Sequence, residues 1–136
     1  MNNIIEVIAR GLLIKDNHLL VCKKKNANYF YLPGGHVEFY ETTEEALHRE
    51  WNEELACDCI IRKYLTHFEE RFVVGTEKFH EYTFLYQVDC NELSIDKQLP
   101  HPEEHLFFNW LPLNEAFHLP LYPENTLKYI QENLKK

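Results

Sequence analysis

No apolar run in this chain approaches the roughly 20 residues that a membrane-spanning helix needs. The first six residues also lack the basic region and the long apolar core of a signal peptide. The four cysteines, Cys22, Cys57, Cys59 and Cys90, form no C-x-x-C pair, and without a secretion signal we expect free thiols in a reducing compartment. The sequence therefore predicts a cytoplasmic protein with no membrane partner.

Positive charge is scarce, with 14 Lys and Arg against 22 Asp and Glu and a formal net charge of −8. Nucleic-acid-binding surfaces depend on clustered Lys and Arg, so the composition argues against a nucleic-acid partner. A nucleotide ligand remains open, because a bound cation could supply the positive charge. The only basic run, residues 23–25, is either a solvated strand end or places one lysine, for which we name Lys23, against a substrate phosphate.

Cys57 and Cys59 flank Asp58, and this spacing could supply half of a zinc site. Alternation along a strand explains the spacing better, so we do not expect zinc there. With 136 residues, of which 45% are hydrophobic and 14% aromatic, the chain can bury a core. We expect one globular domain over residues 1–136.

Residues 32–59 organise the chain, and they suggest a strand end, a tight glycine turn, a short loop and one acidic helix. Gly34 and Gly35 permit backbone angles that a side chain would forbid. Thr42 or Thr43 can cap the helix, and Glu45 follows Thr42 at capping-box spacing. The apolar residues then recur at helical spacing and form a face to bury: Ala46, Leu47, Trp51 and Leu55.

Three glutamates lie beside that apolar face. At about 100° per residue, Glu50, Glu53 and Glu54 fall on one side of the helix. The nearest cation is Arg49, at i,i+4 to Glu53. Like charges within one turn cost stability unless something positive compensates them, and a hard divalent cation such as Mg²⁺ takes oxygen ligands of this kind.

The spacing of Gly35, Glu41, Arg49, Glu50, Glu53 and Glu54 resembles the signature of the Nudix hydrolases, and these six fixed positions match without a gap. Two positions depart from that signature. Trp51 stands where the family usually has a small aliphatic residue, and it demands more room beneath the helix. Ala56 stands where the family has a glycine that stops the helix, so we expect the helix to end a residue or two later.

The resemblance implies a role for each matching residue. Glu50 and Glu54 would bind one to three Mg²⁺ or Mn²⁺ ions together with the carbonyl of Gly34, and Glu53 would be a third ligand or the general base. Arg49 would orient a neighbouring glutamate, and Glu41 would reach back toward Arg49. Many family members add a glutamate from a late loop. Here Glu103 and Glu104 lie in that loop and we favour Glu104, with Glu69 and Glu70 as the competing pair.

Candidate substrate contacts are less well marked than the metal ligands. Tyr31 could stack on a base, although aromatic strand residues are more often core. His80 and Glu81 form an ionisable pair that faces either the cleft or solvent. The candidate contacts are Gly35, Lys23, Tyr31 and His80.

The remaining chain alternates strands with turns. We expect strands at residues 4–14, 18–24, 29–33, 58–72, 78–89 and 105–111, a long loop at 91–104, and later helices at 113–118 and from about 123. Gly11 would be a bulge or a point of close approach. This order, and the resemblance with it, predicts an α/β/α sandwich around a mixed β-sheet.

The resemblance implies metal-dependent hydrolysis of a diphosphate linkage, by attack of water at phosphorus, in a nucleoside diphosphate derivative or a normal or oxidised nucleoside triphosphate. Two alternatives stay open: a Nudix-like module that binds a nucleotide or partner without hydrolysis, and an acidic helix that is only a solvated face. The sequence does not distinguish between the substrates. Homodimers are common in the resembled family, but no interface is identifiable.

Overall fold

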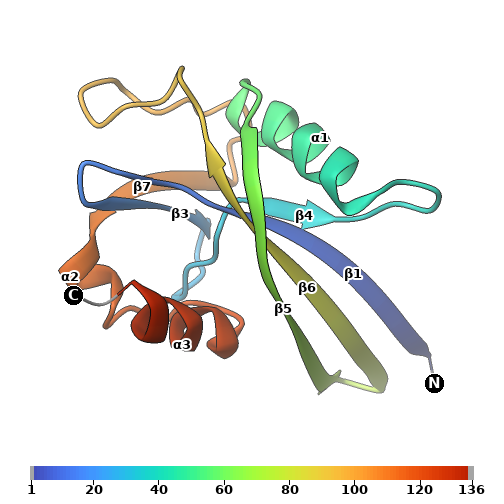
Figure 1. The fold of residues 1–136 in the computed structure, drawn as a ribbon. Coiled ribbons are helices and arrows are strands. Elements are labelled where there is room, and N and C mark those ends of the chain that lie inside the picture. Colours follow the sequence, from blue (N-terminus) through green and yellow to red (C-terminus); the bar gives the residue numbers. More distant parts are fainter. Residues whose placement is uncertain (1, 135–136) are drawn as a thin grey trace.

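The computed structural model describes residues 2–134 (Figure 1). The helices are α1 (Thr43–Leu55), α2 (Leu113–Ala116) and α3 (Glu124–Asn133), and the strands are β1 (Asn3–Leu12), β2 (Ile14–Lys15), β3 (His18–Lys24), β4 (Gly34–His36), β5 (Ile60–Val74), β6 (Glu77–Asp89) and β7 (Leu106–Pro112). In the described chain, no helix combines the length and the apolar character needed to cross a membrane.

The strands form two sheets rather than one. The first has the order β4-β1-β6-β5, with β1 parallel to β6 and the other neighbours antiparallel. The second has the order β2-β3-β7 and is antiparallel. Helices α1 and α3 lie on opposite sides of the strands (Figure 1). The α/β class with a mixed sheet is therefore confirmed.

Two hydrophobic clusters hold these layers together. One gathers Leu47, Trp51 and Leu55 of α1, all with no exposed surface, against the strands. The other gathers Ile130 of α3 with Leu12 of β1 and with Leu19 and Val21 of β3. Neighbouring strand residues point to opposite faces, so β1 can serve both clusters. Each buried side chain of this size stabilises the fold by about 1.5–3 kcal/mol relative to exposure.

The room beneath Trp51 comes from Gly11. Gly11 pairs with Tyr86 in the regular β1–β6 register, so the predicted bulge is absent from this ladder. The predicted close approach is confirmed, since a Cβ on Gly11 would lie 3.0 Å from Val88 Cγ2 and 3.1 Å from Trp51 Nε1. The bare backbone of Gly11 is what lets the indole pack flat beneath the helix.

Helix α1 begins as predicted and ends differently. Thr42 Oγ1 accepts a hydrogen bond from Glu45 N at 3.1 Å, and Glu45 Oε1 accepts one from Thr42 N at 2.9 Å, which completes the capping box. The helix ends at Leu55 because Ala56 adopts the left-handed conformation, with φ 55° and ψ 29°, and donates to Asn52 O at 3.1 Å. The prediction of a later end was wrong, since this cap compensates part of the strain that an alanine brings.

The glycine turn is instead strand β4, antiparallel to β1. Gly34 has φ +147°, and a Cβ there would lie 2.0 Å from Ala9 O, so the strand pairing requires a glycine. The predicted strand at 29–33 is reduced to isolated bridges at Phe30 and Tyr31, followed by Pro33, which has no N–H to donate to a ladder.

The later elements follow the prediction closely. Strand β5 has register shifts between Ile61 and Lys63 and between Tyr64 and Thr66. The segment at 91–104 contains no helix or strand, as expected. Strand β3 pairs over only two residues with β2 and along its whole length with β7.

Candidate active site

A pocket of about 350 Å³ lies where α1, β4 and β1 meet the start of β7. One group of lining residues, the carboxylate wall, consists of Gly34, Gly35, Glu50, Glu54 and Glu103. A second group, which we call the sheet wall, lies on β1 and β6 and consists of Glu6, Arg10 and Glu81; it adjoins the first group where Arg10 pairs with Gly34. Tyr29, Tyr31 and Tyr122 also line the pocket. The lining of the pocket therefore combines carboxylate groups with aromatic side chains.

Glu50 packs directly on the backbone of Gly35. A Cβ on Gly35 would lie 2.0 Å from Glu50 Oε2, so only a glycine leaves room for the carboxylate. The Glu50 side chain is 15% exposed, and burial raises its pKa. Gly35 thus positions a glutamate that the chain has partly withdrawn from water.

Glu54 lies one turn further along α1, in the same wall. Burial, and after it the charge of Glu50, raises the pKa of Glu54 to about 8. A cation bound between Glu50 and Glu54 would favour the ionised form of both carboxylates. A donor set made entirely of oxygen suits Mg²⁺ or Mn²⁺, so these residues fit such an ion.

Arg49 locks the loop before α1 onto the helix. Its Nε donates to Glu41 Oε2 at 2.8 Å and its Nη2 donates to Glu41 Oε1 at 3.0 Å, in a bidentate pair. The same Nη2 donates to His36 O at 2.9 Å. The Arg49 hydrogen bonds, joined by one from the Glu38 N–H, lower the pKa of Glu41 to about 2. Arg49 also reaches Glu53 Oε1 at 3.3 Å.

Glu53 occupies a different position from its two neighbours. Its side chain is 53% exposed and faces Arg49, and it is not among the residues that line the pocket. The structure therefore brings Glu50 and Glu54 together and leaves Glu53 beside them, at the edge of the wall.

The sheet wall contains the carboxyl group of Glu81, the member of the His80–Glu81 pair that was not chosen from the sequence as a substrate contact. Glu81 is only 6% exposed, and across residues 2–134 no donor forms a hydrogen bond to its carboxylate. Burial, and after it the charge of Glu6, raises the pKa of Glu81. Arg10 lies nearby, with its guanidinium 4.8 Å from the centre of the Tyr31 ring and its Nη1 donating to Leu32 O at 3.0 Å.

For three of the residues chosen from the sequence, it is the adjacent residue in the chain that lines the pocket. Lys24 lines it, whereas Lys23 turns its ammonium to 5.9 Å from the Phe30 ring. Glu81 lines it, whereas His80 stacks on Tyr82 at 4.8 Å outside it.

Glu103 lines the pocket, whereas Glu104 is exposed outside it. The competing pair lies on β5 outside the pocket, where Glu69 contacts His80 of β6 and Glu70 accepts a hydrogen bond from Asn125 of α3. Side chains along a strand alternate between its two faces, so counting in steps of two from a residue known to face the pocket would have selected Lys24 and Glu81 as pocket residues.

The comparisons with known proteins agree with this geometry. The NUDIX domain model matches residues 6–132. Over 51 residues the chain is 49% identical to the ADP-ribose pyrophosphatase of Methanocaldococcus jannaschii, and the match covers 35% of this chain and 30% of that relative. The fold is similar to the MutT protein of Methanosarcina mazei, with a TM-score of 0.66, 20% identity and coverage of 99% and 97% of the two chains.

A second solved structure with this fold is the Escherichia coli dihydroneopterin triphosphate pyrophosphohydrolase, with a TM-score of 0.64, 18% identity and coverage of 95% and 93%. The family model spans nearly the whole chain, and three of the six signature residues, Gly35, Glu50 and Glu54, line one pocket. This chain belongs to the NUDIX domain family.

Proposed function

We propose that this chain catalyses the divalent-metal-dependent hydrolysis of a diphosphate linkage in a small nucleotide. The observation that carries the proposal is the carboxylate wall, in which Glu50 and Glu54 lie partly buried against the glycines of β4. Family membership supports a Nudix-type pyrophosphohydrolase. The name of the Methanocaldococcus relative and those of the solved structures favour a phosphoanhydride in a nucleotide or a related compound.

Glu50, Glu54 and the carbonyl of Gly34 would hold Mg²⁺ or Mn²⁺. When bound, such an ion neutralises charge on the phosphate oxygens and lowers the pKa of water. Arg49 would keep the helix and the loop before it in register, so that the carboxylates stay aligned. Because phosphoryl transfer depends mainly on positioning and electrostatics, that alignment is the chief contribution of the protein.

The proton of the attacking water needs an acceptor. We assign this role to Glu103 in place of Glu104, because Glu103 lines the pocket and its charge is felt by Glu54. Glu53, which contacts Arg49 at the edge of the carboxylate wall, would be a third, outer ligand of the metal. Lys24, in place of Lys23, lines the pocket and would face the substrate phosphates.

The aromatic residues would hold the nucleobase. Tyr29 and Tyr122 are each 40% exposed and their ring centres are 5.7 Å apart, which offers a stacking surface. Glu81 would supply a hydrogen bond to the polar edge of the base, since its carboxyl has no partner within the described chain. A substrate with a polar heterocycle at one end and a diphosphate at the other fits this arrangement.

The test is phosphate or pyrophosphate release from a panel of ADP-ribose, diadenosine tetraphosphate, canonical and oxidised dNTPs and UDP-sugars, with and without Mg²⁺ or Mn²⁺. We expect metal-dependent turnover of one class, lost in Glu50→Gln and retained in the matched control Glu44→Gln, which changes an exposed glutamate of the same helix. Absence of turnover, with a nucleotide still raising the Tm, would instead indicate a binding module.

A further inference from the structure

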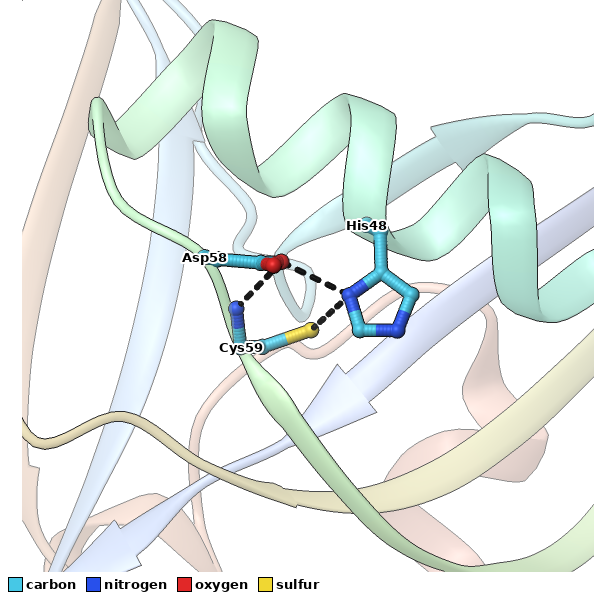
Figure 2. A group of neighbouring side chains, drawn as sticks. All are labelled: His48, Asp58 and Cys59. Atoms are coloured by element: carbon cyan, nitrogen blue, oxygen red, sulfur yellow. Dashed lines mark hydrogen bonds and ion pairs between the residues drawn. The ribbon is translucent and has the colours of Figure 1, made fainter.

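A second group of donor atoms lies on the opposite side of α1. Figure 2 shows His48 of α1 beside Asp58 and Cys59, which lead into β5. His48 Nδ1 lies 2.7 Å from Asp58 Oδ1 and 3.9 Å from Cys59 Sγ. The three donor atoms all lie within 4.8 Å of one another. Nitrogen, oxygen and sulfur thus converge on one point.

The arrangement is not that of a Cys-His-Asp nucleophile. In such a relay the acid and the thiol address opposite nitrogens of the imidazole. Here both face Nδ1, which has only one proton or one lone pair to share. The Asp58 carboxylate already takes that position, so the hydrogen bond does not explain why the thiol points there too.

The donor types identify the class of ligand. Imidazole nitrogen and thiolate sulfur with one carboxylate suit Zn²⁺ and other borderline transition metals, whereas Mg²⁺ prefers oxygen alone. We propose that His48, Asp58 and Cys59 form a zinc-class metal site, separate from the carboxylate wall. His48 lies about 200° around the helix from Glu50, so the two sites occupy opposite faces of α1.

The local charge balance favours a cation at this point. Among the described residues, no lysine or arginine forms an ion pair with Asp58. A bound divalent ion would supply the missing positive charge and take the place of the thiol proton, which is released on binding.

Two of the three proposed ligands are held in place by their surroundings, and the third is free to move. Cys59 is 3% exposed, and His48 is held on a helix. The Asp58 side chain is 60% exposed, which leaves an entry path and room for a water as fourth ligand. Zn–N and Zn–S bonds place tetrahedral ligands about 3.3–3.5 Å apart, so the thiol moves inward by a few tenths of an ångström and the Asp58 hydrogen bond opens.

From the sequence, Cys57 and Cys59 together could supply half of a zinc site, although we did not expect zinc there, and the structure separates these two cysteines. Cys57 turns the other way, and its sulfur lies 3.3 Å from Cys90 Sγ. The Cys57 and Cys90 sulfurs, with Glu92, form a separate group of possible ligands. The site with His48 would join α1 to the start of β5 across the helix end at Ala56.

The test is titration of the full chain with Co²⁺, under a phosphine reductant and with excess Mg²⁺ to occupy the oxygen ligands. We expect one equivalent of Co²⁺ to give a thiolate-to-cobalt charge-transfer absorption that Zn²⁺ displaces. Cys59→Ser should abolish this band, and His48→Gln should weaken Co²⁺ binding more than roughly tenfold. Glu50→Gln and Cys57→Ser should retain it.

Three results would overturn the proposal: no band, a band that survives Cys59→Ser, or a band lost in Cys57→Ser, which would reassign binding to the Cys57–Cys90 group. Circular dichroism establishes that each variant is folded. If Cys59→Ser does not fold, His48→Gln decides the question, because its half-exposed ring can be replaced without opening the core. An undiminished cobalt affinity in that variant would then refute the site.

Discussion

The two walls of the pocket are built on different principles. Glu50 and Glu54 of the carboxylate wall come from one helix, where residues four apart share a face whatever the rest of the chain does. The sheet wall joins Glu6 to Glu81 through the β1–β6 register, across 75 positions of sequence. The two helix glutamates thus depend on local spacing, and the pair in the sheet wall depends on strand pairing. We expect changes in the first to affect catalysis and changes in the second to affect the choice of substrate.

The largest effect is expected from Gly35→Ala in the carboxylate wall. The added Cβ would meet the flexible end of the Glu50 side chain, so the carboxylate moves while the backbone stays in place. We expect metal-dependent turnover to fall by about a hundredfold with little change in Tm. Steady-state kinetics and thermal unfolding of the same sample measure the two effects.

Gly34→Ala is the matched control for that change. Its Cβ would meet the Ala9 carbonyl oxygen in a backbone already at φ +147°, so stability and activity should be lost together. Equal behaviour of the two alanine variants would contradict the role assigned to Gly35.

The sheet wall is tested by Glu81→Gln against His80→Gln. These neighbours lie on opposite faces of β6, and only Glu81 lines the pocket. Replacing a carboxyl oxygen of Glu81 by an NH2 donor changes which groups on the base can pair with it, and should change the preference among nucleobases, as a ratio of kcat/KM values, by about tenfold. His80→Gln should leave that ratio unchanged, and a shift of the same size in both variants would contradict the assignment.

The sequence predicted the pocket residues of the helix correctly and two of those in the strands with errors of one residue, and the same difference between local spacing and strand pairing explains this. The spacing of Glu50 and Glu54 on a helix identified their shared pocket, because a small error in helix ends does not alter it. Lys23 and His80 were chosen in strands, where an error of one residue moves a side chain to the opposite face. Gly34 and Gly35 were assigned to a turn because nothing local reveals that β4 pairs with β1.

Stability against pH tests the charge in the carboxylate wall without substrate. In the metal-free protein the pKa of Glu54 is about 8, above the ordinary value of 4.5. Between these values the native state binds more protons than the unfolded state, so the free energy of unfolding falls as pH rises. Urea denaturation measures the free energy of unfolding at pH 5 and at pH 8. Between these two pH values the wild type should lose at least about 1 kcal/mol more of this free energy than Glu54→Gln loses. A parallel pH dependence in the two proteins would show that Glu54 titrates normally.

The smallest effect is expected at the end of the helix that carries the wall. Ala56→Gly removes the cost of the left-handed conformation, about 1–2 kcal/mol, and adds a glycine entropy cost of about 0.5–1 kcal/mol. We expect a net gain of about 0.5–1 kcal/mol, measured by urea denaturation. Ala46→Gly, inside the same helix, should destabilise the protein. A loss of stability in Ala56→Gly would mean that the alanine methyl makes packing contacts that outweigh the strain.

The contact between Gly11 and Trp51 has a consequence for how this chain can diverge. A methyl group at position 11 would press on the indole and on Val88, so Gly11→Ala requires these side chains to shift by a few tenths of an ångström while Trp51 is present. Replacing Trp51 alone by a smaller aliphatic residue would leave a hole beneath the helix that only a larger residue at position 11 could fill. The two positions are therefore expected to be exchanged as a pair during evolution, with each single replacement a disfavoured intermediate.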